Sequence, residues 1–171
     1  ETEPELAYAI NATAPQVLAE EAAKLGARLI HFSTDYVYDG SKIGAYVESD
    51  ETAPLGVYGK SKLAGENAIR AVGLPSLTFR TSWVYGAHGK NFLKTIIRLA
   101  TERDKLRIVA DQVGAPTSST SIALAVLNVI GKWENETNGI YHLVNEGQTS
   151  LHSFTTAIGE EYSRLQANIN L

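Results

Sequence analysis

The sequence predicts an α/β protein with a mainly parallel β-sheet. Segments with helical periodicity alternate with short apolar runs of strand character along the chain. Glycine and proline stand near the ends of these segments, where helices and strands are expected to stop. Hydrophobic residues make up 44% and charged residues 20% of the 171 residues, a composition typical of a soluble globular protein with a packed core.

Helices are predicted where apolar residues recur at intervals of three and four. They cover residues 4–25, 57–72, 91–103, 122–130 and 151–165. Strands are predicted from short apolar runs at residues 27–32, 76–82, 106–109 and 140–144. A polar loop rich in Asp, Gly, Ser and Tyr follows the first strand, and the tail after the last helix has no clear pattern.

Local signals set the boundaries of the first two helices. Pro15 has no backbone N–H, so it predicts a kink or a restart of the first helix, with Thr13 as a cap. Gly26 marks the end of that helix, and Gly73 and Pro75 mark the end of the second one.

Similar signals delimit the second half of the chain. Gly114 marks a loop, and residues 118–121 offer several caps for the apolar helix that follows. Thr149 or Ser150 is predicted to cap the last helix.

Composition excludes several classes of function. The formal charge is −4, from 15 basic and 19 acidic residues without a basic block, which argues against a nucleic-acid partner. No apolar run approaches the roughly 18 residues of a membrane span, so no membrane partner is expected. The absence of cysteine excludes thiolate zinc sites and a cysteine nucleophile. The histidines lack metal-ligand spacing, so no metal site is predicted.

The pattern that carries chemistry is Tyr58 followed four residues later by Lys62. In a helix the two side chains lie one turn apart on one face. A phenol has a pKa of about 10, and a neighbouring cation lowers it. Such a tyrosine can donate a proton to a developing alkoxide. Thr34 follows the first strand and could hold a substrate carbonyl nearby, although residues 33–35 are equally typical of a simple turn or cap.

Five segments in order give the chain a resemblance to a known family. They are Phe32-Ser-Thr-Asp-Tyr-Val-Tyr-Asp-Gly40, Pro54-Leu-Gly-Val-Tyr-Gly-Lys-Ser-Lys-Leu-Ala-Gly-Glu66, Arg80-Thr-Ser-Trp-Val-Tyr-Gly86, Asn91-Phe92 and Asp111-Gln-Val-Gly-Ala-Pro-Thr117. Together they resemble the extended short-chain dehydrogenase/reductases and, within them, the dTDP-4-dehydrorhamnose reductases. The resemblance implies a truncated, Rossmann-like, doubly wound parallel sheet with parts of a smaller substrate-binding lobe.

The resemblance also implies a reaction. A cytoplasmic enzyme would use NADPH or NADH to reduce the C4 ketone of dTDP-4-dehydro-6-deoxy-L-mannose, giving dTDP-L-rhamnose. Tyr58 would be the general acid, Lys62 would lower its pKa and bind the nicotinamide ribose, and Thr34 would hold the ketone or the Tyr58 hydroxyl. Ser33 would join Tyr58 and Lys62 as a cofactor-binding residue. A homodimer is an assembly that the resemblance allows.

Substrate contacts implied by the resemblance fall on Asp35, Tyr36, Trp83, Asn91 and Phe92. Most of these residues have a structural alternative. Tyr36 and Trp83 could be ordinary packing aromatics, and Asn91 with Phe92 could be a helix start with one core aromatic. Arg80 lies inside a predicted strand and is as compatible with an ion pair as with ligand binding.

The sequence lacks the G-x-G-x-x-G loop that binds a dinucleotide pyrophosphate, and it begins at Glu1. The resemblance therefore implies a fragment. Residues 1–82 would be the later part of a dinucleotide-binding domain, and residues 83–171 substrate-lobe segments interleaved with its last strands and helices. We expect this chain alone to be inactive, to bind NADPH poorly and to expose apolar surface. Another nucleotide-sugar epimerase, dehydratase or reductase of this family, or a non-catalytic regulatory subunit, remains the alternative.

Overall fold

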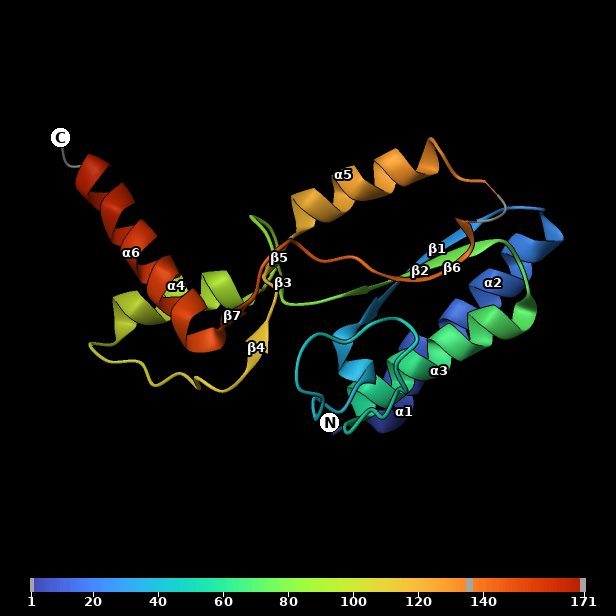
Figure 1. Ribbon diagram of the computed structural model, residues 1–171, viewed down its shortest axis with the longest axis horizontal. Helices are drawn as coiled ribbons and strands as arrows, with labels where there is room; N and C mark the ends of the chain where they lie inside the picture. Colours follow the sequence, from blue (N-terminus) through green and yellow to red (C-terminus); the bar gives the residue numbers. More distant parts are fainter. Residues whose placement is uncertain (1, 135–136, 170–171) are drawn as a thin grey trace. The chain divides into compact units, whose positions relative to one another are not determined.

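The computed structural model describes residues 2–134 and 137–169 (Figure 1). The chain forms two compact units. The first comprises residues Glu1–Thr81 and Ile130–Leu143, and the second comprises Ser82–Val129 and Val144–Leu171. The two units interleave in sequence, because the chain leaves the first unit and returns to it before it ends in the second.

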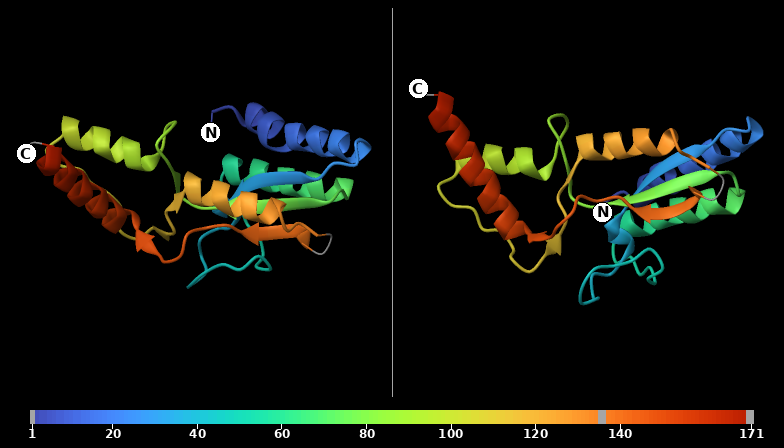
Figure 2. Two further views of the ribbon diagram at one scale, coloured as in Figure 1. Left: turned by 90° about the horizontal axis from the view of Figure 1, so that it is seen from above. Right: turned by 45° about the horizontal axis from the view of Figure 1, so that its top comes forward.

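The first unit is built on a parallel sheet, as the sequence predicts. Its strands, in the order β1-β2-β6, are β1 (Leu29–Thr34), β2 (Ser76–Thr81) and β6 (Gly139–His142). Figure 2 shows these strands side by side. β1 extends two residues beyond the predicted strand, because its pairing with β2 continues to Thr34 opposite Thr81. This extension places the Thr34 side chain at the carboxyl end of the strand.

Helix α3 (Val57–Val72) has the predicted bounds. It ends at Gly73, whose φ of 76° is a left-handed conformation that glycine adopts without steric cost. The helix packs against β1, β2 and the first helical segment, so it presents one face to the sheet.

The first helical segment is continuous, so of the two outcomes predicted at Pro15, a kink or a restart, the restart does not occur. It comprises α1 (Pro4–Tyr8), the π-helical turn η1 (Ala9–Thr13) and α2 (Ala14–Lys24). Thr13 keeps helical φ and ψ and makes no side-chain cap hydrogen bond. Pro15 cannot donate to the Asn11 carbonyl four residues before it, and the wider π-turn accommodates this loss without ending the helix.

Small residues, rather than the recurring large apolar residues from which the helix is predicted, anchor this segment. Ala19 is fully buried and forms a core cluster with Ile69 and Leu74. The large apolar side chains of the segment are exposed in the structure, namely Leu6, Ile10, Val17, Leu18 and Leu25. The close approach of the segment to α3 explains the preference for small residues, because glycine and alanine leave room for a neighbouring backbone.

The described residues of the second unit form three helices and two short strand pairs. These elements are α4 (Phe92–Glu102), α5 (Ser119–Ile130), α6 (Leu151–Ile169), β3 (Val84–Tyr85) paired with β5 (Thr117–Ser118), and β4 (Val113–Gly114) paired with β7 (Thr149–Ser150). The Ser150 hydroxyl accepts the Ser153 N–H at 3.0 Å, so Ser150 rather than Thr149 caps α6. Within the described residues, no helix is both long and apolar enough to cross a membrane.

The predicted strand at residues 106–109 does not form. A short apolar run becomes a strand only where a neighbouring strand completes its hydrogen bonds, and residues 106–109 pair with none of the described strands. In the other direction, α6 runs past the predicted end at residue 165 to Ile169.

Candidate active site

Thr34 occupies the end of β1 and begins the turn that follows it. Its side chain is buried, with 5% of the residue exposed. The Thr34 hydroxyl accepts the Tyr36 N–H at 3.2 Å and donates to an Asp35 carboxylate oxygen at 3.1 Å. It thereby caps the 3₁₀ turn η2 (Asp35–Val37). The local cap that the sequence offered as an alternative is present, and it orients the same hydroxyl that the resemblance assigns to catalysis.

Tyr58 lies in the first turn of α3, beside this turn. Its ring meets the Tyr36 ring edge to face, with centroids 6.0 Å apart. The Thr34 side chain also lies close enough to the Tyr58 phenol to affect its pKa. The approach of helix and turn is close, because a Cβ on Gly59 would lie 2.2 Å from the Tyr36 carbonyl oxygen. Thr34, Asp35, Tyr36 and Tyr58 therefore form one group.

The pKa of Tyr58 is raised, chiefly because burial disfavours the charged phenolate. The contact with the Thr34 side chain acts in the opposite direction. The pKa of Tyr58 is therefore raised, whereas the sequence predicted that Lys62 would lower it. The physical reason is the direction of the lysine, whose ammonium donates to the Phe32 carbonyl at 2.6 Å. Burial also lowers the pKa of Lys62, an effect that Glu66 opposes.

Two buried polar atoms belong to alternate residues of β1, His31 and Ser33. Ser33 Oγ and His31 Nε2 have no hydrogen-bond partner among the described residues. Residues two apart in a strand share a face, so both side chains lie on the side from which Lys62 and Glu66 act on His31. Among the described residues, the Ser33 hydroxyl is therefore a buried polar group without a partner, one position before Thr34.

Burial lowers the pKa of His31 from 6.5 to about 4, and the nearby Lys62 charge acts in the same direction. As the pH falls, His31 is protonated in the unfolded chain before it is protonated in the folded chain. The associated stability is therefore fully present above about pH 6.5 and is lost as the pH falls toward 4. His31→Gln should remove this pH-dependent component, which amounts to at most about 3 kcal/mol.

Urea unfolding at pH 7 and pH 4.5 measures the effect, because carboxylates common to both proteins cancel in the comparison. His88→Gln, at an exposed position, is the matched control and should behave as the parent chain. An equal loss of stability on acidification in the parent and in His31→Gln would contradict the prediction.

The other predicted substrate contacts belong to the second unit, so the structure does not group them with Thr34 and Tyr58. Trp83 and Phe92 pack on Phe154, with ring centroids 6.5 Å and 5.8 Å from it. Asn91 caps α4 by accepting the Lys94 N–H at 3.1 Å. These are the structural roles that the sequence offered as alternatives, and substrate contact by these three residues stays a prediction.

Trp83 has an uncommon backbone conformation, with a φ of 44°. A positive φ is strained for a bulky residue and is seen mainly where the surroundings enforce it. Here the indole lies on Gly114, where a Cβ would come within 2.6 Å of the ring. Strand β4 therefore needs glycine at this position for the indole to lie where it does.

Sequence reasoning missed Glu66, which is 2% exposed on the sheet-facing side of α3. Its carboxylate forms an ion pair with Arg80 at 2.7 Å. The ion-pair alternative for Arg80 is thus confirmed. The spacing of Glu66 one turn after Lys62 could have placed it on the helix face that carries Tyr58 and Lys62. Within the described part of the chain, no three His, Asp or Glu residues are grouped as metal ligands.

A parallel α/β unit with threonine, tyrosine and lysine gathered at the carboxyl end of a strand is the architecture of the extended short-chain dehydrogenase/reductases, the class that the sequence resembles. Within this class the match is specific. The family model described as the RmlD substrate binding domain matches residues 1–170. The chain belongs to this family.

Relatives with this architecture support the same assignment. A dTDP-4-dehydrorhamnose reductase of Burkholderia thailandensis is 47% identical over 158 residues, which are 89% of this chain and 53% of the relative. One of Shigella flexneri is 44% identical over 173 residues, covering 100% of this chain and 58% of the relative. The chain thus spans about half the length of the curated relatives it matches.

Solved structures agree in fold. A dTDP-4-dehydrorhamnose reductase from Bacillus anthracis, in complex with NADP, has a TM-score of 0.90 at 37% identity and covers 95% of this chain and 57% of its own. One from Clostridium acetobutylicum has a TM-score of 0.87 at 42% identity, covering 92% of this chain and 55% of its own. The Rossmann-like α/β fold that the resemblance implies is confirmed.

Proposed function

We propose that this chain carries the catalytic group of a dTDP-4-dehydrorhamnose reductase, which reduces the 4-keto group of dTDP-4-dehydro-6-deoxy-L-mannose to give dTDP-L-rhamnose. The observation that carries the proposal is the group of Thr34, Tyr58 and Lys62 around the end of β1. The names of the relatives support the choice of substrate.

Tyr58 is the proton donor in this proposal. A phenol is protonated at neutral pH, which is the state in which a general acid must start, and burial raises the pKa of Tyr58 further in that direction. When the C4 carbonyl carbon is reduced, negative charge develops on its oxygen, and the Tyr58 hydroxyl supplies the proton. Thr34 is held in place by its contacts to the η2 turn, and it orients the Tyr58 hydroxyl and the substrate ketone toward each other. Asp35 and Tyr36 contact the sugar from the same turn.

The residues present fit a nicotinamide cofactor. Ser33 offers a buried hydroxyl without a partner among the described residues, and Lys62 offers a partly buried cation beside Tyr58. When bound, NADPH or NADH supplies the hydride for the sugar C4 carbon. Lys62 holds the ribose hydroxyls and adds positive charge near the Tyr58 phenol. In doing so, its ammonium exchanges the hydrogen bond to the Phe32 carbonyl for one to the ribose.

The second unit contributes the remaining substrate contacts in this proposal, through Trp83, Asn91 and Phe92. The interleaved units support the view that residues 83–171 combine substrate-lobe segments with the last elements of the dinucleotide-binding domain. A cytoplasmic location and a homodimer belong to the same proposal.

Transfer of labelled hydride tests the reaction. The complete protein is incubated with the 4-keto sugar nucleotide and NADPH or NADH carrying deuterium at the transferred position. A reductase yields a 4-hydroxy sugar with one deuterium at C4 for each coenzyme oxidised. An epimerase or dehydratase returns the label to the coenzyme or never removes it, and that result would overturn the proposal.

This 171-residue chain by itself should bind NADPH at least about 100-fold more weakly than the complete protein. It contains no glycine-rich phosphate loop, and the loss of two charged hydrogen bonds to the pyrophosphate costs about 3 kcal/mol or more. Isothermal titration calorimetry of both proteins measures the difference. Equal dissociation constants would show that the cofactor does not need such a loop here.

A further inference from the structure

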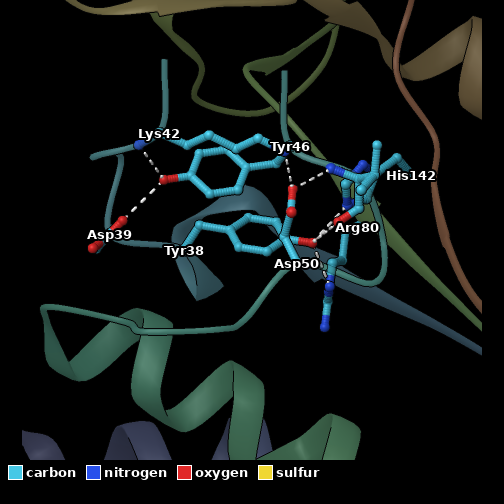
Figure 3. Close-up of polar contacts among 8 residues, drawn as sticks. Tyr38, Asp39, Lys42, Tyr46, Asp50, Arg80 and His142 are labelled. Atoms are coloured by element: carbon cyan, nitrogen blue, oxygen red, sulfur yellow. Dashed lines mark hydrogen bonds and ion pairs between the residues drawn. The ribbon is translucent and has the colours of Figure 1, made fainter. Parts of the chain in front are cut away.

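The Tyr38 hydroxyl is a buried junction of three hydrogen-bonding groups (Figure 3). Tyr38 is 6% exposed. Its oxygen lies 2.6 Å from Arg80 Nη1, 2.9 Å from His142 Nε2 and 3.1 Å from the Val47 carbonyl oxygen. The junction joins the segment after η2 to strands β2 and β6, which carry Arg80 and His142.

Counting hydrogens fixes the roles at this junction. A phenol has one proton to donate and two lone pairs to accept with, whereas a guanidinium can only donate and a carbonyl can only accept. Tyr38 therefore accepts from Arg80 and donates to Val47. Its second lone pair faces His142 Nε2, so all three contacts are satisfied together when that nitrogen carries a proton. A hydroxyl at this position is the group that fits all three partners.

Arg80 connects the junction to the helix that carries Tyr58. Its Nε and Nη2 donate to the two Glu66 carboxylate oxygens at 3.0 Å and 2.7 Å. The side chains of Arg80 and Glu66 are 5% and 1% exposed. Glu66 follows Lys62 by one helical turn and Tyr58 by two, so all three share one face of α3.

The same junction is connected to Thr34 through the backbone. Tyr38 directly follows the η2 turn, whose last residue, Val37, is fully buried. Tyr38, Arg80 and Glu66 thus link the segment after η2 to helix α3 on one side, and the contact between the Thr34 and Tyr58 side chains links them on the other. Movement of Tyr38 would therefore move Thr34 relative to the helix.

Energetics favour a role in positioning over a role in stability. A buried ion pair of this kind is often no more stabilising than an apolar replacement, because both charges lose their hydration. It does impose a single geometry, because the bidentate contact between guanidinium and carboxylate is directional. Misplacing a catalytic group by about 1 Å can cost about 10²-fold in rate.

We propose that Tyr38 is a positioning residue, which holds the η2 turn at a set distance from helix α3 through Arg80 and Glu66 and so aligns Thr34 with Tyr58. This inference rests on the proposed reductase function for its kinetic consequence. Its structural consequence, a fixed environment for the Tyr58 phenol, is independent of the reaction.

The chain provides a matched control in Tyr46. Its ring stacks on Tyr38 with centroids 4.3 Å apart, but its hydroxyl contacts Asp39 and the Lys42 N–H instead of the junction. Tyr46→Phe removes a hydroxyl from the same stacked pair and leaves the junction intact. Tyr38→Phe keeps the stacking and removes only the junction oxygen.

In the complete protein, Tyr38→Phe should lower kcat about 10- to 100-fold, with the KM for NADPH within about twofold of the parent. Tyr46→Phe should leave both constants unchanged. The second measurement is the titration of Tyr58 followed by ¹³C-labelled tyrosine NMR, which needs no turnover. The pKa of Tyr58 should shift in Tyr38→Phe, because the contact between Thr34 and Tyr58 is disturbed. It should not shift in Tyr46→Phe.

His142→Leu removes a donor to Tyr38 and keeps the Tyr38 hydroxyl. It should change kcat and the titration of Tyr58 in the same directions as Tyr38→Phe does. His142→Gln should restore them in part, because its amide again offers an N–H. If Tyr38→Phe does not fold, this pair decides the question. An inactive parent protein would disprove the reductase proposal alone. An unchanged Tyr58 titration in folded Tyr38→Phe, or in His142→Leu, would overturn the positioning role.

Discussion

Tyr58→Phe is expected to lower kcat of the complete protein by about 10²–10⁴-fold, the usual contribution of a positioned general acid. The substitution removes the hydroxyl that would protonate the C4 alkoxide and keeps the ring that meets Tyr36 edge to face. The affinity for the sugar nucleotide should change little, because most of the surface of the nucleotide lies away from the Tyr58 hydroxyl. Steady-state kinetics and isothermal titration calorimetry separate the two effects.

The pH dependence of kcat provides a second test of the same role. A general acid must be protonated, and burial places the pKa of Tyr58 above its ordinary value. The parent rate should therefore stay level through neutral pH and fall only at strongly alkaline pH. The residual rate of Tyr58→Phe should lack that fall. Tyr8→Phe, on helix α1, is the control for removing a tyrosine hydroxyl from the first unit.

A regulatory subunit would respond differently. Its partner binding would be unchanged in Tyr58→Phe, and the parent protein would show no turnover for the substitution to remove. A parent enzyme that is active and a Tyr58→Phe variant with unchanged kcat would contradict the assignment of Tyr58 as the acid.

Gly65→Ala is expected to destabilise the first unit by about 2 kcal/mol or more, as overpacking of a rigid site does. A Cβ on Gly65 would lie 2.1 Å from the Asn11 carbonyl oxygen, which is backbone and cannot rotate away. The Asn11 side chain also donates to the fully buried Ser61 hydroxyl at 3.0 Å, so the two helices have little freedom to separate. Helix propensity alone predicts the opposite sign, a gain of about 1 kcal/mol.

Gly159→Ala is the matched control, because Gly159 lies inside α6 with no atom within 4 Å of its would-be Cβ. It should stabilise the second unit by about 0.5–1 kcal/mol. Urea unfolding can follow the units separately, because Trp133 belongs to the first and Trp83 to the second. Stabilisation by Gly65→Ala would show that the helices can move apart at this contact.

The features that could be read from the sequence are those encoded over a few neighbouring residues. The bounds of α3 follow from its periodicity and from Gly73, which ends it with a left-handed φ. The spacing of Tyr58 and Lys62 places them on one face of that helix wherever the helix packs. The motif order was also sufficient to predict the family, which the family model confirms.

The features that the sequence predicted wrongly depend on contacts with residues distant in the chain. The run at residues 106–109 has strand composition but pairs with no described strand. The first helix continues through Pro15 because a π-turn absorbs the missing hydrogen bond, and its Ala19 rather than its large apolar residues reaches the core. Local propensity contains no information about which surface a neighbouring element will cover.

The proposed catalytic group depends on both local spacing and tertiary contacts. By itself the sequence determined the alternating α/β order, the Tyr58 and Lys62 pair and the threonine after the first strand, because each depends on spacing along the chain. Only the tertiary structure decided that Glu66 pairs with Arg80, that Arg80 meets Tyr38, and that Lys62 donates to the β1 backbone. Such contacts form where parallel strands bring the ends of separate segments together, and their energies depend on burial that no local pattern records.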